Sequence, residues 1–263
     1  MKPGIYPELD EVTYHADPDS ISASRIKRIL RSPAHFKMAP ERTEAMDFGT
    51  AFHTTVLGVG PEIIYVDAAS WRGKAAADER AEAWSNGTTP LLVKDAALIQ
   101  GMADSVRAHP SAAQLINLCK PEVSMFWDDP EWSIQRRCRF DLLDEDSGVS
   151  VDLKSTSAGV SFADISRAIV RFGYDFSAAW YEATARGCGV NVTASALIFC
   201  DTKPPHQVRV VELSEDFIQR GRAHITKALT AYQQATETDA WPAYDDPGYS
   251  TIHPPKWARE ETA

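Results

Sequence analysis

The stretch from Arg139 to Thr156, RFDLLDEDSGVSVDLKST, constrains the fold of this chain more than any other. Two apolar, strand-like runs are joined by DEDSG, a segment of acids, Ser and Gly that is typical of a tight turn. Alternate residues of a strand share a face, so Asp152 and Lys154 point the same way, and Asp141 shares a face with Arg139. The pattern predicts a hairpin in whose register Asp141, Asp152 and Lys154 converge.

Such a convergence has a chemical consequence. Two carboxylates a few ångströms apart repel each other unless a cation lies between them, and oxygen-only ligands select a hard ion such as Mg²⁺ or Mn²⁺. A lysine beside them can orient a water molecule and offset charge on a phosphate. The D-x-K tripeptide alone is equally compatible with a lysine that only forms a salt bridge at a sheet edge.

Two further residues extend the set. Glu122 begins the preceding strand-like run, and His53 lies on an apolar helix face after FGTAF. A single histidine in such a position is most often a hydrogen-bonded core residue. Taken together with Asp141, Asp152 and Lys154, however, these two residues complete a set of three acids, one histidine and one lysine.

Composition narrows the class of protein. The chain has 263 residues, 44% of them hydrophobic, and we interpret residues 1–263 as a single domain. Its net charge of −10 argues against a protein that coats nucleic acid nonspecifically, although it leaves room for a local basic channel. The four cysteines form no C-x-x-C pair, which indicates reduced thiols and neither a zinc site nor a disulfide framework.

No apolar run approaches the length of a membrane span, so we expect no association with a membrane. The N-terminal segment MKPGIYPELDEVTYHADPDS lacks the apolar core of a signal peptide. We therefore expect a cytoplasmic location.

The hydrophobic patterns divide the chain into a helical part at 20–118, a sheet-and-helix part at 119–236 and an irregular tail at 237–263. The first twenty residues are expected to be an extended lead-in, and the polar, Ala-rich insert at 68–93 a mobile or peripheral helix and loop. Helices are predicted over ISASRIKRILRSPAHF, MDFGTAFHTTVLG, 94–108, 162–172, 174–186 and from about 215. Three antiparallel strands are predicted over EVSMFWDD, SIQRRCRFDLL and VSVDLKST, and two more strands over VTASALIFCD and HQVRVVELS.

The ordered motifs resemble the PD-(D/E)XK nucleases of the exodeoxyribonuclease VIII (RecE-type) group, which is related to the RecB nuclease domain. The resemblance runs from about Ile21 to Tyr181 and rests on ISASRIKRILRSPAHF, MDFGTAFHTTVL, PEVSMFW, RCRFDLL, VDLKST and YDFSAAWY, in that order. The segment WRGKAAADERAEAWSNGTTPLL is similar to the insert of phage-borne members. The resemblance implies an α/β fold with a restriction-endonuclease-like core, in which helices flank a central mixed β-sheet.

The resemblance also implies roles for individual residues. His53, Asp141, Asp152 and the backbone carbonyl of Leu153 would hold the metal ion, expected to be Mg²⁺ with Mn²⁺ able to substitute. Lys154 would position the attacking water. The remaining implied site residues are the additional acid Glu122 and the DNA-lining Tyr174 and Tyr181, although core packing explains the two tyrosines equally well.

Further residues are candidates for contact with DNA. Ser22, Ser24 and Arg25 lie at a predicted helix N-terminus, where a terminal 5′ phosphate could bind, although the serines are also simple helix caps. Arg137 and Arg139 are candidate phosphate contacts, and a solvent-facing or ion-paired role is equally compatible with the sequence.

One departure from the family pattern is Ser177, which stands where relatives commonly have Gln in the Y-x-x-Q-x-x-x-Y helix. A serine at this place can reach the lysine or a phosphate only through water, which bears on catalytic efficiency.

The implied function is exonucleolytic hydrolysis of linear double-stranded DNA from its ends, in the 5′-to-3′ direction. The 3′ single strands would pass to a single-strand annealing protein of the RecT-like kind. The resemblance further implies a homo-oligomer, as a closed ring, and a phage or prophage origin. The alternatives are a Cas4-like or structure-selective nuclease, a DNA-end-binding recombination scaffold with weak or no nuclease activity, and a structural α/β protein with an accidental D-x-K.

Overall fold

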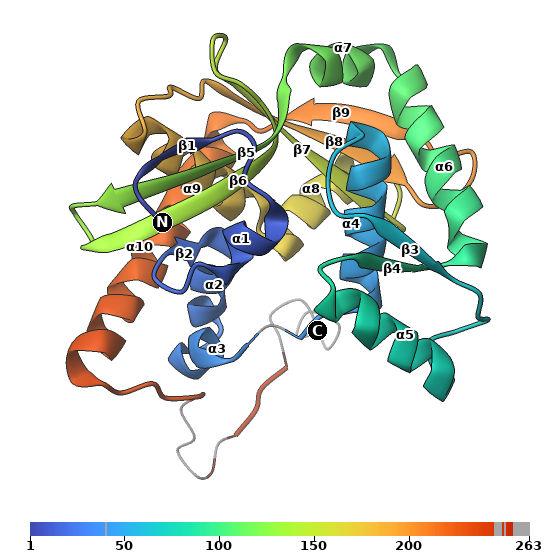
Figure 1. Cartoon of the computed structure of the whole chain (residues 1–263). Coiled ribbons are helices and arrows are strands. Elements are labelled where there is room, and N and C mark those ends of the chain that lie inside the picture. The colour runs from blue at the N-terminus through green and yellow to red at the C-terminus, as the bar shows by residue number, and fades with distance from the viewer. Residues whose placement is uncertain (40, 245–248, 250, 255–263) are drawn as a thin grey trace, which may run out of the picture.

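A mixed, seven-stranded β-sheet forms the centre of the computed structural model, which describes residues 1–39, 41–244, 249 and 251–254 (Figure 1). The strand order is β1-β5-β6-β7-β8-β9, and the short β2 pairs with β6. The strands of this sheet are β1 (Gly4–Tyr6), β2 (Ile21–Ser22), β5 (Lys120–Asp129), β6 (Ile134–Asp144), β7 (Val149–Thr156), β8 (Ala194–Asp201) and β9 (Val208–Glu212).

The pairing confirms the predicted antiparallel unit of β5, β6 and β7. β8 joins β7 in parallel, and β9 joins β8 antiparallel, so the sheet is mixed as the sequence led us to expect. The turn between β6 and β7 also matches its prediction. Gly148 adopts a φ of 72°, and a Cβ atom there would lie 2.3 Å from the Asn191 carbonyl oxygen, so both conformation and space require glycine.

Helices cover both faces of the sheet, as expected. The helices are α1 (Glu11–Ala16), α2 (Ala23–Lys27), α3 (Pro33–Lys37), α4 (Glu44–Leu57), α5 (Lys74–Ser85), α6 (Val93–Ala108), α7 (Pro110–Leu118), α8 (Phe162–Phe172), α9 (Tyr174–Gly187) and α10 (Glu215–Thr238), with a 3₁₀ turn, η1 (Arg28–Leu30), after α2. The larger core gathers α2, α8, α9 and α10 against one face of the sheet. The second core gathers α4, α6 and α7 against the other face.

The two cores explain why these elements form. Trp180 and Phe176 of α9 are fully buried against Phe140 of β6 in the larger core. In the second core Phe52 of α4 is buried against Leu153 of β7. Burial of such aromatic and aliphatic side chains supplies most of the free energy that holds a helix on a sheet, roughly 1.5–3 kcal/mol for each.

In the first half of the chain the lead-in differs from its prediction, and one helix was missed. The lead-in is not simply extended, because β1 pairs with β5 and Asp10 caps α1, whose Tyr14 is buried. The helix predicted over ISASRIKRILRSPAHF is present as α2 and η1 with Ser22 as its cap, and Pro33 begins the next helix, α3, as its missing N–H allows. Helix α7 was not predicted and also starts at a proline.

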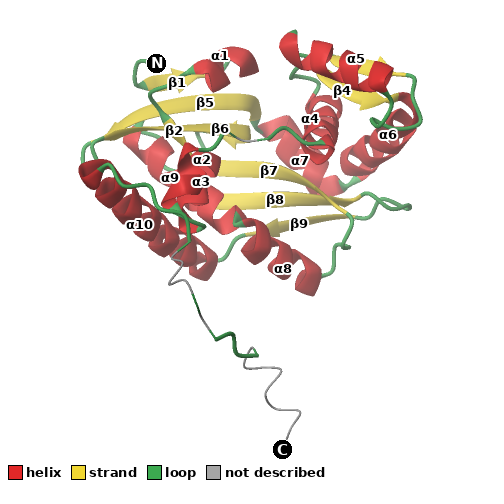
Figure 2. Cartoon of the chain, turned by 90° about the horizontal axis from the view of Figure 1, so that it is seen from below, coloured by secondary structure: helices red, strands yellow, loops and turns green. Residues whose placement is uncertain are grey.

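The insert lies at the periphery, where it forms a small unit of its own beside α4 (Figures 1 and 2). It contains α5 as predicted, together with two unpredicted strands, β3 (Ile63–Val66) and β4 (Thr89–Leu92), that pair in parallel. Arg80 and Trp84 of α5 both donate hydrogen bonds to the carboxylate of Asp47 on α4, at 2.7 and 3.0 Å respectively. Asp47 is only 2% exposed, so this contact fixes the insert to the helix that carries His53.

The predicted irregular tail starts slightly later than expected, because α10 continues to Thr238. Residues 241–243 have no regular structure, and Trp241 stacks on Phe36 with 5.6 Å between ring centroids. The tail prediction over 245–248, 250 and 255–263 lies outside the described residues. Among the helices that the structure describes, none is long and apolar enough to cross a membrane.

Candidate active site

The candidate site lies where β6 and β7 separate. The antiparallel ladder between them pairs Leu143 with Ser150 and Leu142 with Val151. At the next position the Leu153 backbone N–H donates a hydrogen bond to Asp141 Oδ2 at 2.8 Å. The carboxylate of Asp141 thus occupies the opening between the strands and takes over a ladder hydrogen bond, which holds it at the edge of the separated strands.

The backbone of β5 is irregular at Glu122, which lies between the residues of β5 that pair with Phe140 and Leu142 of β6. Glu122 has a φ of 57°, a left-handed conformation that costs a non-glycine residue free energy. In the neighbouring strand Phe140 belongs to the larger core and Leu142 to the second core, although simple alternation would place both on one face. The strand geometry therefore changes at Asp141, and a strained backbone at that level is typical of a functional site.

Helix α4 brings His53 to these strands. The helix is capped by Thr43 and ends at Gly58, which has a left-handed conformation. His53 Nε2 lies 2.7 Å from the carbonyl oxygen of Leu153, and its Nδ1 lies 3.4 Å from Asp141 Oδ2. Ala51, two residues before His53, is fully buried, which allows α4 to pack closely against its neighbours.

Asp152 and Lys154 complete the group from the same face of β7, as alternation predicted. Lys154 Nζ donates a hydrogen bond to Asp152 Oδ1 at 2.6 Å. The two side chains are 19% and 28% exposed for lysine and aspartate respectively, so the ion pair faces an opening and is not sealed in the core.

The charges of these four side chains shift one another's pKa values. Burial raises the pKa of Asp152, Lys154 lowers it, and the nearby Asp141 raises it again, with a net result of about 6. Burial also acts to raise the pKa of Asp141, but His53 and Lys154 outweigh it and the pKa falls. Burial acts to lower the pKa of His53 and Lys154, but the two carboxylates outweigh it and raise both. The two carboxylates thus compete for the same cations, and of the two Asp152 is protonated first as the pH falls.

These groups suit a hard divalent cation. Two carboxylates and a backbone carbonyl are the oxygen donors that Mg²⁺ and Mn²⁺ prefer, and His53 adds an imidazole. Within the described residues, no three His, Cys, Asp or Glu side chains are gathered into a ready-made metal site. The candidate donors do not form such a group for two reasons. The Asp152 carboxylate is hydrogen-bonded to Lys154, and Leu153 would contribute its main-chain carbonyl oxygen and no side chain. The donor set therefore fits the metal after a local rearrangement of Asp152.

Glu122 and Arg139 form an ion pair beside this group. Burial raises the pKa of Glu122, while Arg139 lowers it and Asp141 raises it, with a net upward shift. Arg139 also donates to the Leu9 carbonyl oxygen at 2.8 Å. The structure thus brings Glu122 near the site as predicted, and gives Arg139 the ion-paired role that the sequence left open.

Arg137 has partners inside the protein. It is 7% exposed, and its Nη1 donates to the Asp17 carbonyl oxygen at 2.7 Å and to Ser20 Oγ at 3.3 Å. Its guanidinium also lies over the ring of Tyr14, 5.1 Å from the centroid. These contacts account for Arg137 as a structural residue, and the predicted phosphate contact has no support from its position.

Ser22, Ser24 and Arg25 lie at the start of α2. Ser22 caps the helix by accepting a hydrogen bond from the Arg25 backbone N–H at 3.3 Å, as one of the two alternatives predicted. Ser24 is exposed, and its Oγ lies 3.1 Å from that of Ser22. The Arg25 side chain lies over the Phe36 ring, 4.8 Å from the centroid. Binding of a 5′ phosphate at this place stays a prediction.

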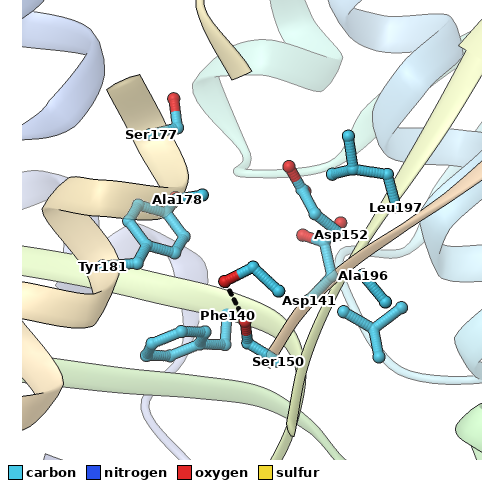
Figure 3. A pocket seen from close by; sticks show the side chains of 11 residues that line it. Phe140, Asp141, Ser150, Asp152, Ser177, Ala178, Tyr181, Ala196 and Leu197 are labelled. Atoms are coloured by element: carbon cyan, nitrogen blue, oxygen red, sulfur yellow. Dashed lines mark hydrogen bonds between the residues drawn. The ribbon is translucent and has the colours of Figure 1, made fainter. Parts of the chain in front are cut away.

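Tyr181 and Ser177 of α9 line a small pocket together with Asp141 and Asp152, and Figure 3 shows the two acids beside each other there. Tyr181 also packs edge-on against Phe140, with 5.1 Å between ring centroids, so it belongs to both the core and the pocket. The Ser177 hydroxyl donates to the Gly173 carbonyl oxygen at 3.4 Å. Helix α9 therefore places Tyr181 and Ser177 beside the two acids. The position where relatives commonly have Gln is part of the pocket wall.

Lys27 is a neighbour of the site that the sequence analysis missed. Its Nζ donates to the Phe172 carbonyl oxygen at 2.7 Å. Burial and the charge of Lys154 lower its pKa, while Asp175 and Asp152 raise it, so it lies within electrostatic reach of the candidate site. The sequence contained one indication of this residue. The segment between Asp19 and Glu41 has five lysines and arginines and no acid, which marks it as a positively charged segment.

A family whose description is "PDDEXK-like domain of unknown function (DUF3799)" matches residues 22–248. A solved structure of a candidate exonuclease from Eubacterium rectale is similar, with a TM-score of 0.64 and 11% identity over 97% of this chain and 98% of that chain. At this identity the likeness shows a shared fold.

Two more distant structures are also similar. A phage-related exonuclease from Haemophilus somnus has a TM-score of 0.38 and 10% identity over 84% of this chain and 96% of that chain. An alkaline exonuclease from Laribacter hongkongensis has a TM-score of 0.28 and 12% identity over 84% and 93% respectively. Among curated proteins, none matches this chain.

Proposed function

Since the chain belongs to the family of PDDEXK-like domains of unknown function (DUF3799), we propose that it is a metal-dependent exonuclease that acts on linear double-stranded DNA. The observation that carries the proposal is the convergence of His53, Asp141, Asp152 and Lys154 at the point where β6 and β7 separate. Buried acids that are not matched by cations cost free energy, so a fold keeps them together only with a further partner. The solved structure of a candidate exonuclease that shares this fold supports the same chemistry.

The proposed roles follow from the contacts. His53, Asp141, Asp152 and the Leu153 carbonyl would hold a divalent cation, Mg²⁺ or Mn²⁺, which when bound polarises a phosphate and acidifies water. The Leu153 N–H fixes the Asp141 carboxylate, so this ligand needs no reorganisation. The Lys154 ammonium, already directed at the acids by Asp152, is placed to orient the water and to offset charge that develops on the phosphate.

The polarity and the partners are finer parts of the same proposal. We infer 5′-to-3′ degradation that leaves 3′ single strands for a single-strand annealing protein, and a homo-oligomeric ring around the DNA. The support is the motif resemblance together with the charge distribution. The chain is acidic overall, yet the segment that carries α2 and α3 has five cations and no acid, which suits a positive lining limited to one face.

End-labelled DNA tests the proposal. Linear duplex with a 5′ phosphate, labelled at either end, is incubated with Mg²⁺, Mn²⁺ or EDTA, alongside a closed circle and the Lys154→Ala variant. We expect early release of the 5′ label, dependence on metal, a resistant circle and an inactive variant. Cutting of the circle would instead identify an endonuclease, and early release of the 3′ label would reverse the polarity.

A second candidate is a DNA-end-binding scaffold with weak nuclease activity. The observation that favours it is Ser177, which lines the pocket of the acids and bonds only to its own helix, through the Gly173 carbonyl oxygen. In the same assay, binding to DNA ends without cleavage in either metal would support the scaffold and contradict the nuclease.

A further inference from the structure

We propose that Phe172 and Tyr174 form a stacking platform for an unpaired base of the DNA strand held at the candidate site. The inference rests on the proposed nuclease function and refines its substrate, because it predicts a preference for DNA ends whose last base pairs are open. Neither the sequence motifs nor the family comparison assigns a role to Phe172.

The two aromatic rings lead outward from the site. Lys154 Nζ lies over the Tyr174 ring, 5.1 Å from its centroid. The Phe172 ring is in turn stacked on Tyr174, with 5.7 Å between centroids and an interplanar angle of 28°. Phe172 is 50% exposed, so an aromatic surface faces solvent one ring away from the lysine of the site.

The junction that carries these rings is held in place. It consists of the last residue of α8, Gly173, and the first residue of α9. Gly173 has a φ of 66°, and a Cβ atom there would lie 3.1 Å from Lys27 Cδ. Lys27 reaches across from α2 to donate to the Phe172 carbonyl oxygen, which adds a cation at the C-terminal end of α8. The platform is therefore anchored to a second helix and does not depend on a free loop.

The surrounding charges favour a nucleotide as the occupant. The Arg171 guanidinium lies 5.4 Å from the Phe172 centroid, and Arg171 is exposed. With Lys27 and Lys154, three cations border the two rings, and the last two turns of α8 contain no acid. Base stacking on an aromatic ring combined with cations for the phosphates is the common mode of binding single-stranded nucleic acid.

A partner protein would be a weaker match to this surface. An apolar protein contact would have to cover the exposed Arg171, for which the last two turns of α8 offer no acid. A nucleotide supplies the missing negative charge itself, because its phosphate can reach the cations while its base covers the ring. We therefore commit to an unpaired base of the strand whose phosphate reaches the candidate site.

The chain offers a matched control on the same helix. Phe162 begins α8, is 70% exposed, and has the Arg209 guanidinium 4.5 Å from its ring centroid. It is thus an exposed phenylalanine beside an arginine at the opposite end of α8. Phe172→Ala and Phe162→Ala remove equivalent side chains, so a difference between them reports position and not loss of surface area.

The experiment reads binding and hydrolysis separately. A duplex that ends in three unpaired bases, the outermost a fluorescent 2-aminopurine, is titrated with protein in EDTA, and hydrolysis of the same duplex is then measured with Mg²⁺. We expect the full-length protein to quench the probe, and Phe172→Ala to bind about 10-fold more weakly without quenching. Phe162→Ala should match the unmodified protein, Phe172→Trp should retain quenching and Phe172→Leu should lose it.

Each outcome has a distinct meaning. Equal binding and quenching by Phe172→Ala and Phe162→Ala would overturn the platform, whether or not the DNA is degraded. Quenching that depends on Phe172, in a protein that degrades no DNA, would keep the platform and overturn the proposed nuclease. Hydrolysis that is equally fast on open and closed ends, and unchanged in Phe172→Ala, would overturn the platform and leave the nuclease in place.

Discussion

Strand β6 carries a charged cluster on each side of its midpoint, and the two are built in opposite ways. At one end Arg136 forms an ion pair with Asp129, and both residues are almost fully buried, at 5% and 2% exposure. Trp180 and Trp127 flank the guanidinium, 4.5 and 5.4 Å from their ring centroids. At the other end, five residues further on, Asp141 meets Asp152 in a half-open pocket.

The difference is one of stoichiometry. Arg136 and Asp129 match one cation to one anion, so the charges of this closed cluster are balanced within the chain. In the open cluster only Lys154 carries a permanent positive charge, because His53 is a cation only when protonated. Two carboxylates therefore compete for Lys154, and the pKa of Asp152 rises to about 6. A buried charge that is matched stabilises the fold, whereas one that is not matched indicates a partner from outside. The comparison therefore predicts opposite effects for equivalent substitutions.

The largest expected effect is loss of hydrolysis in Asp152→Asn. The substitution removes a candidate metal ligand and the partner of Lys154, so the rate of DNA hydrolysis should fall by about 10³-fold. The free energy of unfolding in EDTA should rise slightly, because the raised pKa shows that the folded state disfavours this carboxylate. Hydrolysis of end-labelled duplex and urea denaturation check the two parts. A strongly destabilised variant would mean that Asp152 is a structural residue like Asp129.

The closed cluster should respond in the opposite way. Asp129→Asn leaves the buried Arg136 without its counter-charge, which should lower the free energy of unfolding by roughly 3–5 kcal/mol. The rate of hydrolysis per folded molecule should stay unchanged, because Asp129 lies outside the pocket of the acids. Urea denaturation and a nuclease assay on the folded fraction measure both. Equal stability of Asp129→Asn and the unmodified protein would remove the distinction between the clusters.

The sign of the pH effect sharpens the contrast. The folded Asp152 carboxyl binds its proton more tightly than the unfolded one, with a pKa of about 6 against 3.8. The metal-free protein should therefore lose stability from this group as the pH rises from about 4 to about 6. A metal ion needs the ionised carboxylate, so apparent Mn²⁺ affinity should rise over the same range, by up to about 10-fold per pH unit.

Thermal unfolding with and without Mn²⁺ at pH 4, 5, 6 and 7 tests this effect. The matched comparison is Asp152→Asn, in which the metal-free stability should no longer fall between pH 4 and pH 6. An Mn²⁺ stabilisation that is the same at pH 5 and pH 7 in the unmodified protein would argue that Asp152 does not bind the ion.

The two clusters also show how far the sequence could be interpreted. Alternation placed Asp152 and Lys154 on one face, and the turn between the strands brought Asp141 to them, because both depend on local geometry. The role of Arg137 depends on a distant partner, since the lead-in with Asp17 folds back onto β6, and alternation alone cannot reveal that contact. The left-handed conformation of Glu122 could not be predicted either. Sequence patterns indicate the backbone conformation that a residue prefers, and Glu122 adopts one that non-glycine residues disfavour.

The insert and the aromatic platform were missed for a related reason. The strands β3 and β4 are short and pair across α5, so each has too few residues for a clear alternating pattern. Phe172 fits the apolar pattern of its helix, and only the structure shows that its ring stacks on Tyr174 and is half exposed. Sequence patterns predict which residues are apolar, whereas exposure depends on what packs against them.

The smallest expected effect concerns Ser177, at the open cluster. Ser177→Gln places an amide in the pocket that contains Asp141 and Asp152, where the serine hydroxyl only reaches back to Gly173. One additional hydrogen bond to Lys154 or to a phosphate is worth roughly 1 kcal/mol, so the rate of hydrolysis should rise about fivefold. Ser177→Met has a similar length without the amide and should leave the rate unchanged or lower. A rise in both variants would assign the gain to filling of the pocket, and a rise in neither would mean that the open cluster is already complete once the metal ion and DNA are bound.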